Sequence, residues 1–290
     1  MNWIIGVAFL VVIGYLLDRE IYFYEGAHLG PRLQAWLYDR WSKKYDEGKR
    51  ASQLRDDEML AGPLLEVLRD VPNPFILDFA TGTGRLSYAM LKREEFKGRI
   101  IALDLSLGML ERAVVKISGA LTAGTNSTVP ALSAQKTRIE FLRHPTLPLP
   151  FPDAAFDAVC ALEVLELFPS MDEPLAELTR VLRPGGVLLT SRGTEESGRK
   201  AKVRSITEFT TLLQRYGVER IQITKWWKLF DRVLAEKQGS SQPVEFQELA
   251  EVLKCSSCQS RQWSRTSNQW KCQACGKQLA KTKESIVLNV

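Results

Sequence analysis

The feature that most constrains this chain is an apolar run that ends in a glycine-rich turn. Residues 75–79 are Phe-Ile-Leu-Asp-Phe, and an apolar run of this length after two prolines is typical of a buried strand in a parallel sheet. Gly82 and Gly84 follow, and residues 86–92 have the pattern of a helix. A strand, a glycine turn and a helix bring backbone N–H groups and a helix N-terminus close to a ligand. The sequence therefore predicts an α/β fold with a binding site at this turn.

The acids around this turn indicate what kind of ligand it binds. The dinucleotide fingerprint needs a third glycine where this chain has Ser87, so that pattern fails. Instead, Asp78 lies at the end of the first strand, and Asp104 ends the next expected strand at residues 99–104. An acid at the end of the second strand can accept both hydroxyl groups of a ribose, and Leu105 beside it can pack on an adenine ring. The arrangement favours a nucleoside with a cationic or hydrogen-bond-donating group over a pyrophosphate.

The segments at residues 76–87 and 100–113 resemble the class I S-adenosylmethionine-dependent methyltransferases, and within them the branch of the ubiquinone and menaquinone biosynthesis methyltransferases. Three further motifs of that branch are present in the expected order, one before these segments at residues 38–46 and two after them at residues 149–159 and 178–187. The resemblance extends over residues 36–238. It implies a Rossmann-like seven-stranded sheet with helices on both faces, and S-adenosylmethionine as the cofactor.

The resemblance also implies roles for individual residues. Gly82 and Gly84 would let the backbone approach the methionine part of the cofactor. Asp78 would lie near its amino group, and Asp104 would hold the ribose. Ala80 stands where the family often has a glycine, and Tyr38 is expected to close over the cofactor. The predicted cofactor-binding residues are therefore Tyr38, Asp78, Ala80, Gly82, Gly84, Asp104 and Leu105.

No catalytic base is evident in the sequence. Relatives often carry a histidine where this chain has Leu167, and its two histidines are His28 and His144. Methyl transfer from a sulfonium can proceed largely through positioning, so a base is not required. Two residues are candidates. Glu163 follows the fourth strand, where the ligand crevice of a parallel sheet lies, and it is either a pocket residue or a solvated carboxylate. His144 is either a base near the cofactor or a histidine in a surface loop.

The N-terminal residues 3–17, WIIGVAFLVVIGYLL, carry no charge. As a helix they would span about 22 Å, compared with about 30 Å for the hydrocarbon core of a bilayer. A cleaved signal peptide, a buried helix of the soluble domain and a membrane anchor are the alternatives. We favour a single-pass anchor in residues 1–24, because aromatic residues flank the run and basic residues follow it. The catalytic domain would then lie in the cytoplasm, and without an anchor the protein would be cytoplasmic.

Four of the five cysteines form two CxxC pairs near the C-terminus, Cys255 with Cys258 and Cys272 with Cys275. Two such pairs separated by 13 residues match the spacing of a structural zinc site. A catalytic zinc ion would keep an open coordination position, which four thiolates do not leave. Redox-active dithiols are the alternative.

Residues 249–290 resemble the small zinc-ribbon proteins that activate methyltransferases of tRNA, rRNA and translation factors. The resemblance implies either an internal stabiliser of the methyltransferase domain or a contact for nucleic acid. Trp263 and Trp270 would stack on bases in the second case, but we favour their packing inside the ribbon. The predicted division is residues 1–24, a methyltransferase domain at 25–238, and a linker with a zinc ribbon at 239–290.

The charge distribution separates the functional hypotheses. Residues 1–191 carry 21 basic and 24 acidic side chains, whereas residues 192–290 carry 18 and 10, which suggests an anionic partner for the C-terminal third. The leading hypothesis is a methyltransferase that acts on a lipophilic small molecule at the cytoplasmic face of a membrane. The alternatives are an RNA or protein methyltransferase guided by the ribbon, and a non-catalytic scaffold that binds the cofactor.

Residues 118–136 are small and polar and are expected to form a flexible insertion.

Overall fold

A computed structural model describes residues 2–123, 138–197, 203–244 and 247–289, and most of the expected insertion at 118–136 lies outside these ranges. Seven strands follow one another across the sheet in the order β6-β7-β5-β4-β1-β2-β3. The strands β1 to β5 are parallel, and β7 is antiparallel to both of its neighbours. This confirms the expected seven-stranded sheet. Its strands are β1 (Phe75–Phe79), β2 (Arg99–Asp104), β3 (Ile139–Arg143), β4 (Phe156–Ala161), β5 (Leu182–Gly193), β6 (Val218–Lys225) and β7 (Phe230–Lys237).

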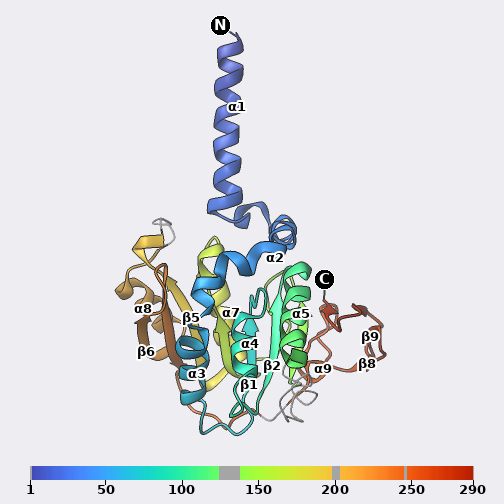
Figure 1. The fold of residues 1–290 in the computed structure, drawn as a ribbon. Coiled ribbons are helices and arrows are strands. Elements are labelled where there is room, and N and C mark those ends of the chain that lie inside the picture. Colours follow the sequence, from blue (N-terminus) through green and yellow to red (C-terminus); the bar gives the residue numbers. More distant parts are fainter. Residues whose placement is uncertain (1, 124–137, 198–202, 245–246, 290) are drawn as a thin grey trace.

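Helices cover both faces of this sheet (Figure 1). Alternate side chains of β1 enter different clusters of buried apolar residues, with Leu77 in one cluster and Ile76 in the other. Cys160 of β4 lies in the cluster of Ile76, as expected for a core cysteine. The principal helices are α2 (Pro31–Gln53), α3 (Gly62–Val67), α4 (Arg85–Leu91), α5 (Leu107–Ala123), α7 (Asp172–Val181) and α8 (Ile206–Arg215). Short helical turns are η1 (Arg19–Phe23), η2 (Ala27–Leu29), η3 (Asp57–Ala61), η5 (Leu165–Leu167) and η6 (Glu195–Ser197).

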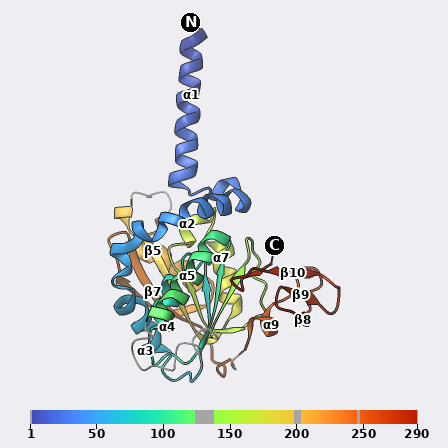
Figure 2. The same cartoon turned by 45° about the vertical axis from the view of Figure 1, so that its right-hand side comes forward.

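Helix α1 (Asn2–Asp18) projects away from the rest of the chain (Figures 1 and 2). Its large apolar side chains are exposed, for example Trp3 at 73% and Leu10 at 68%, so the alternative of a helix buried in the soluble domain is wrong. At 17 residues α1 is about 26 Å long, short of the roughly 30 Å of a bilayer core. Within the described ranges, no helix has both the length and the apolar character needed to cross a membrane. The expected spanning helix at residues 3–17 is therefore not supported.

The C-terminal segment continues the central sheet. After α9 (Leu249–Val252) it forms β8 (Trp263–Arg265), β9 (Gln269–Cys272), β10 (Gln278–Lys281) and β11 (Val287–Leu288). Strand β11 pairs in parallel with β3, so the four strands extend the sheet beyond β3 to eleven strands (Figure 2). Trp270 is 4% exposed, and the indole N–H of Trp263 donates to the carbonyl of Leu253 at 2.8 Å. Both tryptophans thus pack within this segment, as we favoured over base stacking.

The attachment of this segment depends on two buried side chains, Ile286 just before β11 and Val287 within it. Ile286 is fully buried in one core cluster, and Val287 lies in the cluster on the other face. We expect Ile286→Ala to lower the free energy of unfolding by about 2–5 kcal/mol, because it leaves a cavity in the shared core. Denaturation in urea measures this. Ser264→Ala on exposed β8 is the control and should change stability by less than about 0.5 kcal/mol. Equal stabilities of the two variants would contradict a shared core.

Candidate functional site

A cavity of about 390 Å³ opens at the carboxyl ends of the parallel strands. Helix α2 lies across this side of the sheet in Figure 1, and its residues Tyr38 and Tyr45 line the cavity. Open parallel sheets bind their ligands at this edge. Seven of the predicted site residues line the cavity, namely Tyr38, Ala80, Gly82, Asp104, Leu105, His144 and Glu163. Asp78 and Gly84 are not among its lining residues.

The glycine turn has the left-handed backbone that its sequence requires. Ala80, Gly82 and Gly84 have φ angles of 54°, 56° and 74°. Ala80 thus adopts a conformation that glycine prefers, in line with its position in the family motif. A Cβ atom on Gly84 would lie 3.0 Å from the Cβ of Ala113 and 3.3 Å from the Cδ1 of Ile117. Gly84 therefore allows α4 to pack on α5, and its approach to the cofactor stays a prediction.

Asp78 supports the turn from inside the core. Its carboxylate oxygen accepts hydrogen bonds from the hydroxyl groups of Thr81 at 2.7 Å and Ser87 at 2.6 Å. Burial raises the pKa of Asp78, although both hydroxyl groups oppose the shift. The side chain that breaks the dinucleotide fingerprint, Ser87, is thus one of its two hydroxyl donors. The contact between Asp78 and the cofactor stays a prediction.

Asp104 brings a carboxylate to the cavity wall at the end of β2. The backbone N–H groups of Gly82 and Ser106 each donate to it at 2.8 Å. Burial raises the pKa of Asp104 to about 6, and the charges of Asp78 and Asp39 act in the same direction. Leu105 lines the cavity next to it. A carboxylate and an adjacent apolar side chain suit a ribose and its base, and the contacts of Asp104 and Leu105 with the cofactor stay predictions.

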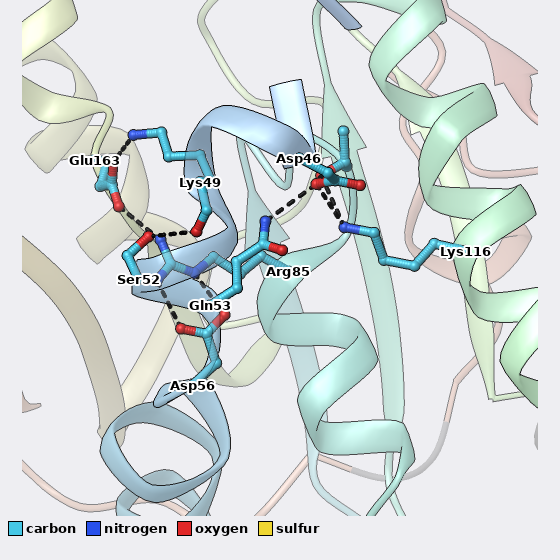
Figure 3. A network of polar contacts seen from close by, with 9 residues as sticks. Asp46, Lys49, Ser52, Gln53, Asp56, Arg85, Lys116 and Glu163 are labelled. Atoms are coloured by element: carbon cyan, nitrogen blue, oxygen red, sulfur yellow. Dashed lines mark hydrogen bonds and ion pairs between the residues drawn. The ribbon is translucent and has the colours of Figure 1, made fainter. Parts of the chain in front are cut away.

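Residues of the family motif at 38–46 attach α2 to the glycine turn and to α5. Asp39 accepts from the hydroxyl of Ser106 at 2.5 Å and from the N–H of Gly108 at 2.8 Å. Asp46 accepts from the hydroxyl of Thr83 at 2.6 Å and from the ammonium of Lys116 at 2.8 Å (Figure 3). Burial raises the pKa of Asp46, but these hydrogen bonds outweigh it and the net shift is downward. Both ends of the motif therefore hold α2 against the glycine turn and α5.

The motif also places two tyrosines in the cavity wall. Tyr38 and Tyr45 both line the cavity, and the hydroxyl of Tyr38 donates to the carboxylate of Glu25. Burial, followed by nearby carboxylates, raises the pKa of both phenols, so they are neutral at physiological pH. Tyr38 thus lies in the cavity wall, and its closing over the cofactor stays a prediction. Tyr45, which the sequence analysis did not single out, shares this wall.

Glu163 belongs to a network of buried charges (Figure 3). The guanidinium of Arg85 forms two hydrogen bonds of 2.6 Å with Asp56 and one of 2.7 Å with Glu163, whose second oxygen pairs with Lys49. The Glu163 side chain is only 12% exposed, so the alternative of a solvated carboxylate is wrong. Both of its oxygens are engaged by cations. The network joins α2, α4 and the loop after β4.

His144 lies in the cavity wall with both ring nitrogens occupied. Its Nε2 atom is 3.2 Å from the carbonyl of Pro148, and its Nδ1 atom is 3.2 Å from the carbonyl of Asn289 and 3.3 Å from that residue's side-chain amide. Burial lowers the pKa of His144, so the ring is neutral at physiological pH. Because these contacts fix the ring, it has a structural role here, and its assignment as a base stays a prediction.

The four cysteines near the C-terminus form a compact cluster. Their sulfur atoms all lie within 4.8 Å of one another, with 3.5 Å between Cys255 and Cys275 and 3.6 Å between Cys258 and Cys272. A tetrahedral zinc ion with bonds of about 2.3 Å separates its sulfur ligands by about 3.8 Å. Although desolvation opposes it, backbone N–H groups of Cys275 and Ala274 lower the pKa of Cys272 to about 6. The cluster therefore has the geometry and the donors of a metal site.

The buried charge network gives a stability prediction. Arg85→Met removes the cation between Asp56 and Glu163, which are 6% and 12% exposed. We expect a loss of about 3–5 kcal/mol in the free energy of unfolding, because the buried Asp56 loses its ion partner and Glu163 keeps only Lys49. The control is Arg93→Met, whose ion pair with the exposed Asp57 should be worth about 1 kcal/mol or less. Similar losses for the two variants, measured by chemical denaturation, would refute the role of the network.

Comparisons with known proteins agree with this geometry. Residues 77–190 match the family model described as a methyltransferase domain. Demethylmenaquinone methyltransferase of Thermobifida fusca is 32% identical over 159 residues, covering 55% of this chain and 60% of the relative. That of Lactococcus lactis is 27% identical, over 52% of this chain and 54% of the relative. The chain thus spans little more than half the length of these relatives.

A solved structure shares the fold. A SAM-dependent methyltransferase from Aquifex aeolicus superimposes with a TM-score of 0.50 at 20% identity, covering 68% of this chain and 97% of that one. At this identity the likeness concerns the fold. The strand order, the cavity at the carboxyl edge and the match to the family model lead to one conclusion. Residues 77–190 of this chain match the methyltransferase domain family, and the chain has the fold of S-adenosylmethionine-dependent methyltransferases.

Proposed function

We propose that this protein transfers a methyl group from S-adenosylmethionine to a lipophilic small molecule. The observation that carries the proposal is that one cavity combines a polar nucleoside side with an apolar side. Asp104 and Gly82 belong to the polar side, and the apolar lining includes Phe79, Leu147, Val164, Leu167 and Phe168. Apolar walls of this kind bind apolar ligands by removing their surface from water. The menaquinone precursor named in the relatives' descriptions is an acceptor of this class.

The residues of the cavity would act by binding and positioning. When bound, the cofactor supplies a methyl group on a positively charged sulfur. Asp104 would accept hydrogen bonds from ribose hydroxyl groups, and Leu105 would pack on the adenine. The neutral phenols of Tyr38 and Tyr45 would exclude water from the acceptor. Because the base candidates Glu163 and His144 are engaged by other groups, positioning is the contribution that the site supports best.

We propose in addition that α1 attaches the protein to lipid at the cytoplasmic face of a membrane. Its exposed side chains are apolar around the whole helix, including Trp3, Phe9, Val12 and Leu16. A helix of this kind is stable when its surface is covered, and acyl chains offer such cover. A lipophilic acceptor would give this attachment a purpose.

The cysteine cluster is proposed to hold one structural zinc ion. We expect one equivalent of zinc per chain by elemental analysis, and a lower thermal unfolding midpoint after chelation, because metal binding to this segment is coupled to its folding. Cys272→Ser should lower both the zinc content and the midpoint. Cys160→Ser is the control for zinc content, because Cys160 lies in the sheet core, away from the cluster. Full zinc content in Cys272→Ser would contradict the site.

The proposed activity is tested with methyl-labelled S-adenosylmethionine and a membrane lipid extract. Label is expected in the organic phase, whereas label in RNA or protein would favour those acceptors. Cofactor binding without any transfer would indicate a scaffold.

Binding of S-adenosylhomocysteine, followed by calorimetry, tests the role of Asp104. The charged carboxylate binds ribose hydroxyl groups more strongly, and its pKa in the free protein is about 6. Affinity should therefore fall as the pH drops below about 6. Asp104→Asn should weaken binding about 10- to 100-fold at pH 8 and remove this pH dependence. Asp70→Asn, at a side chain 92% exposed, should bind like the unmodified protein. An unchanged affinity in Asp104→Asn would exclude the ribose contact.

A further inference from the structure

The outer face of α2 has a composition unlike its inner face. Side chains on the inner face, such as Ala35 and Leu37, are buried. On the outer face, Leu33 and Trp36 are 40% and 55% exposed, and the exposed basic residues Arg32, Arg40, Lys43, Lys44 and Arg50 surround and follow them. Residues three and four positions apart lie on one side of a helix, so Leu33, Trp36, Arg40, Lys43 and Lys44 form a single stripe. The exposed Glu47 follows the stripe at its C-terminal end.

The basic side chains of this stripe form no ion pair with the described residues of the molecule. The ion pairs of α2 are formed by Lys49 and Asp46, which face Glu163 and Lys116 on the cavity side. Among the described residues, Arg40, Lys43 and Lys44 form no ion pair. A shallow groove runs along them, and its lining includes Trp36 and Trp41. Tryptophans beside unpaired cations are typical of the boundary between acyl chains and anionic headgroups.

Helix α2, which carries the stripe, is linked to α1 through η1 and η2 and contributes to the cavity lining. Figures 1 and 2 show α1 rising from the side of the molecule that α2 covers. Between the two helices, η2 exposes Leu29 at 43%. Ala27 of η2 and Pro31 and Gln34 of α2 line the cavity. A surface that contacts α1 and the stripe together would therefore lie close to this part of the cavity wall.

We infer that the outer face of α2 docks on a bilayer containing anionic lipids, and that this docking lets the acceptor enter the cavity from the lipid beside η2. The inference rests on the proposed lipophilic acceptor. The partner is an anionic bilayer because the stripe supplies apolar side chains next to α1 and unpaired positive charge beyond them. Lipid headgroups satisfy that charge, and acyl chains cover Leu33 and Trp36.

The test is flotation of the full chain with vesicles of phosphatidylcholine, alone or mixed with phosphatidylglycerol. We expect tighter binding to the mixed vesicles, and this difference should shrink as salt is added. In the variant Arg40→Glu/Lys43→Glu/Lys44→Glu, the partition coefficient on mixed vesicles should fall roughly 100-fold, because each lost basic residue costs about fivefold. Binding to phosphatidylcholine alone should change little, since α1 is intact.

The matched control is Arg69→Glu/Lys92→Glu/Lys97→Glu, which changes the net charge by the same amount at exposed residues outside α2. It should retain most of its binding to mixed vesicles. Equal losses in both variants would mean that net charge, and not the α2 face, controls binding, and would overturn the inference. Binding of the unmodified chain to an RNA oligomer but not to mixed vesicles would overturn it as well.

Calorimetry with S-adenosylhomocysteine separates this test from that of the proposed function. The α2 variant should keep the cofactor affinity of the unmodified protein, because none of the three changed side chains lines the cavity. Loss of vesicle binding with normal cofactor affinity supports the inference. Vesicle binding that depends on the stripe, in a protein that methylates no lipid, would refute the proposed acceptor and the entry route while the docking surface stands.

Discussion

The buried guanidinium of Arg85 joins the segments that surround the cavity. It begins α4 directly after the glycine turn, stacks 4.5 Å from the ring centre of Trp226, and is neutralised by Asp56 and Glu163. A buried cation without partners is strongly unfavourable, so the segments that carry these carboxylates are held in place together. Lys49 adds α2 to the same set through Glu163. The glycine turn, helix α2 and the loop after β4 are therefore held together by this network of ion pairs.

The same charges fix the side chain of Glu163 in the cavity wall. Its backbone has a φ of 54°, and its N–H donates to the hydroxyl of Ser191 at 2.7 Å. An uncommon backbone conformation held by surrounding contacts is often found where a side chain must point in one direction. Here the direction is toward two cations. The cavity lining thus includes a carboxylate that is already paired with cations.

The sequence predicted those parts of the site that depend on local patterns. The strands β1 and β2, which carry Asp78 and Asp104, were evident because each apolar run and its acid lie within a few residues. The reason for Gly84 was not evident, because its neighbour Ala113 lies on another helix. The ion pair between Lys49 and Glu163 joins residues 114 positions apart, and no local pattern indicates it. Similarly, the apolar character of residues 3–17 was evident, but its exposure on a projecting helix depends on the rest of the fold.

Pairing of β11 with β3 has a consequence for the edge of the sheet. Without the C-terminal segment, β3 would present a row of unpaired N–H and C=O groups, a template on which other chains can add strands. The segment covers that row and leaves as the new edge β8, which is only three residues long. Since the covering segment belongs to the same chain, its local concentration at β3 is set by the linker and not by the cell's supply of a partner. Protection from edge-to-edge association is therefore present in every copy, even at great dilution.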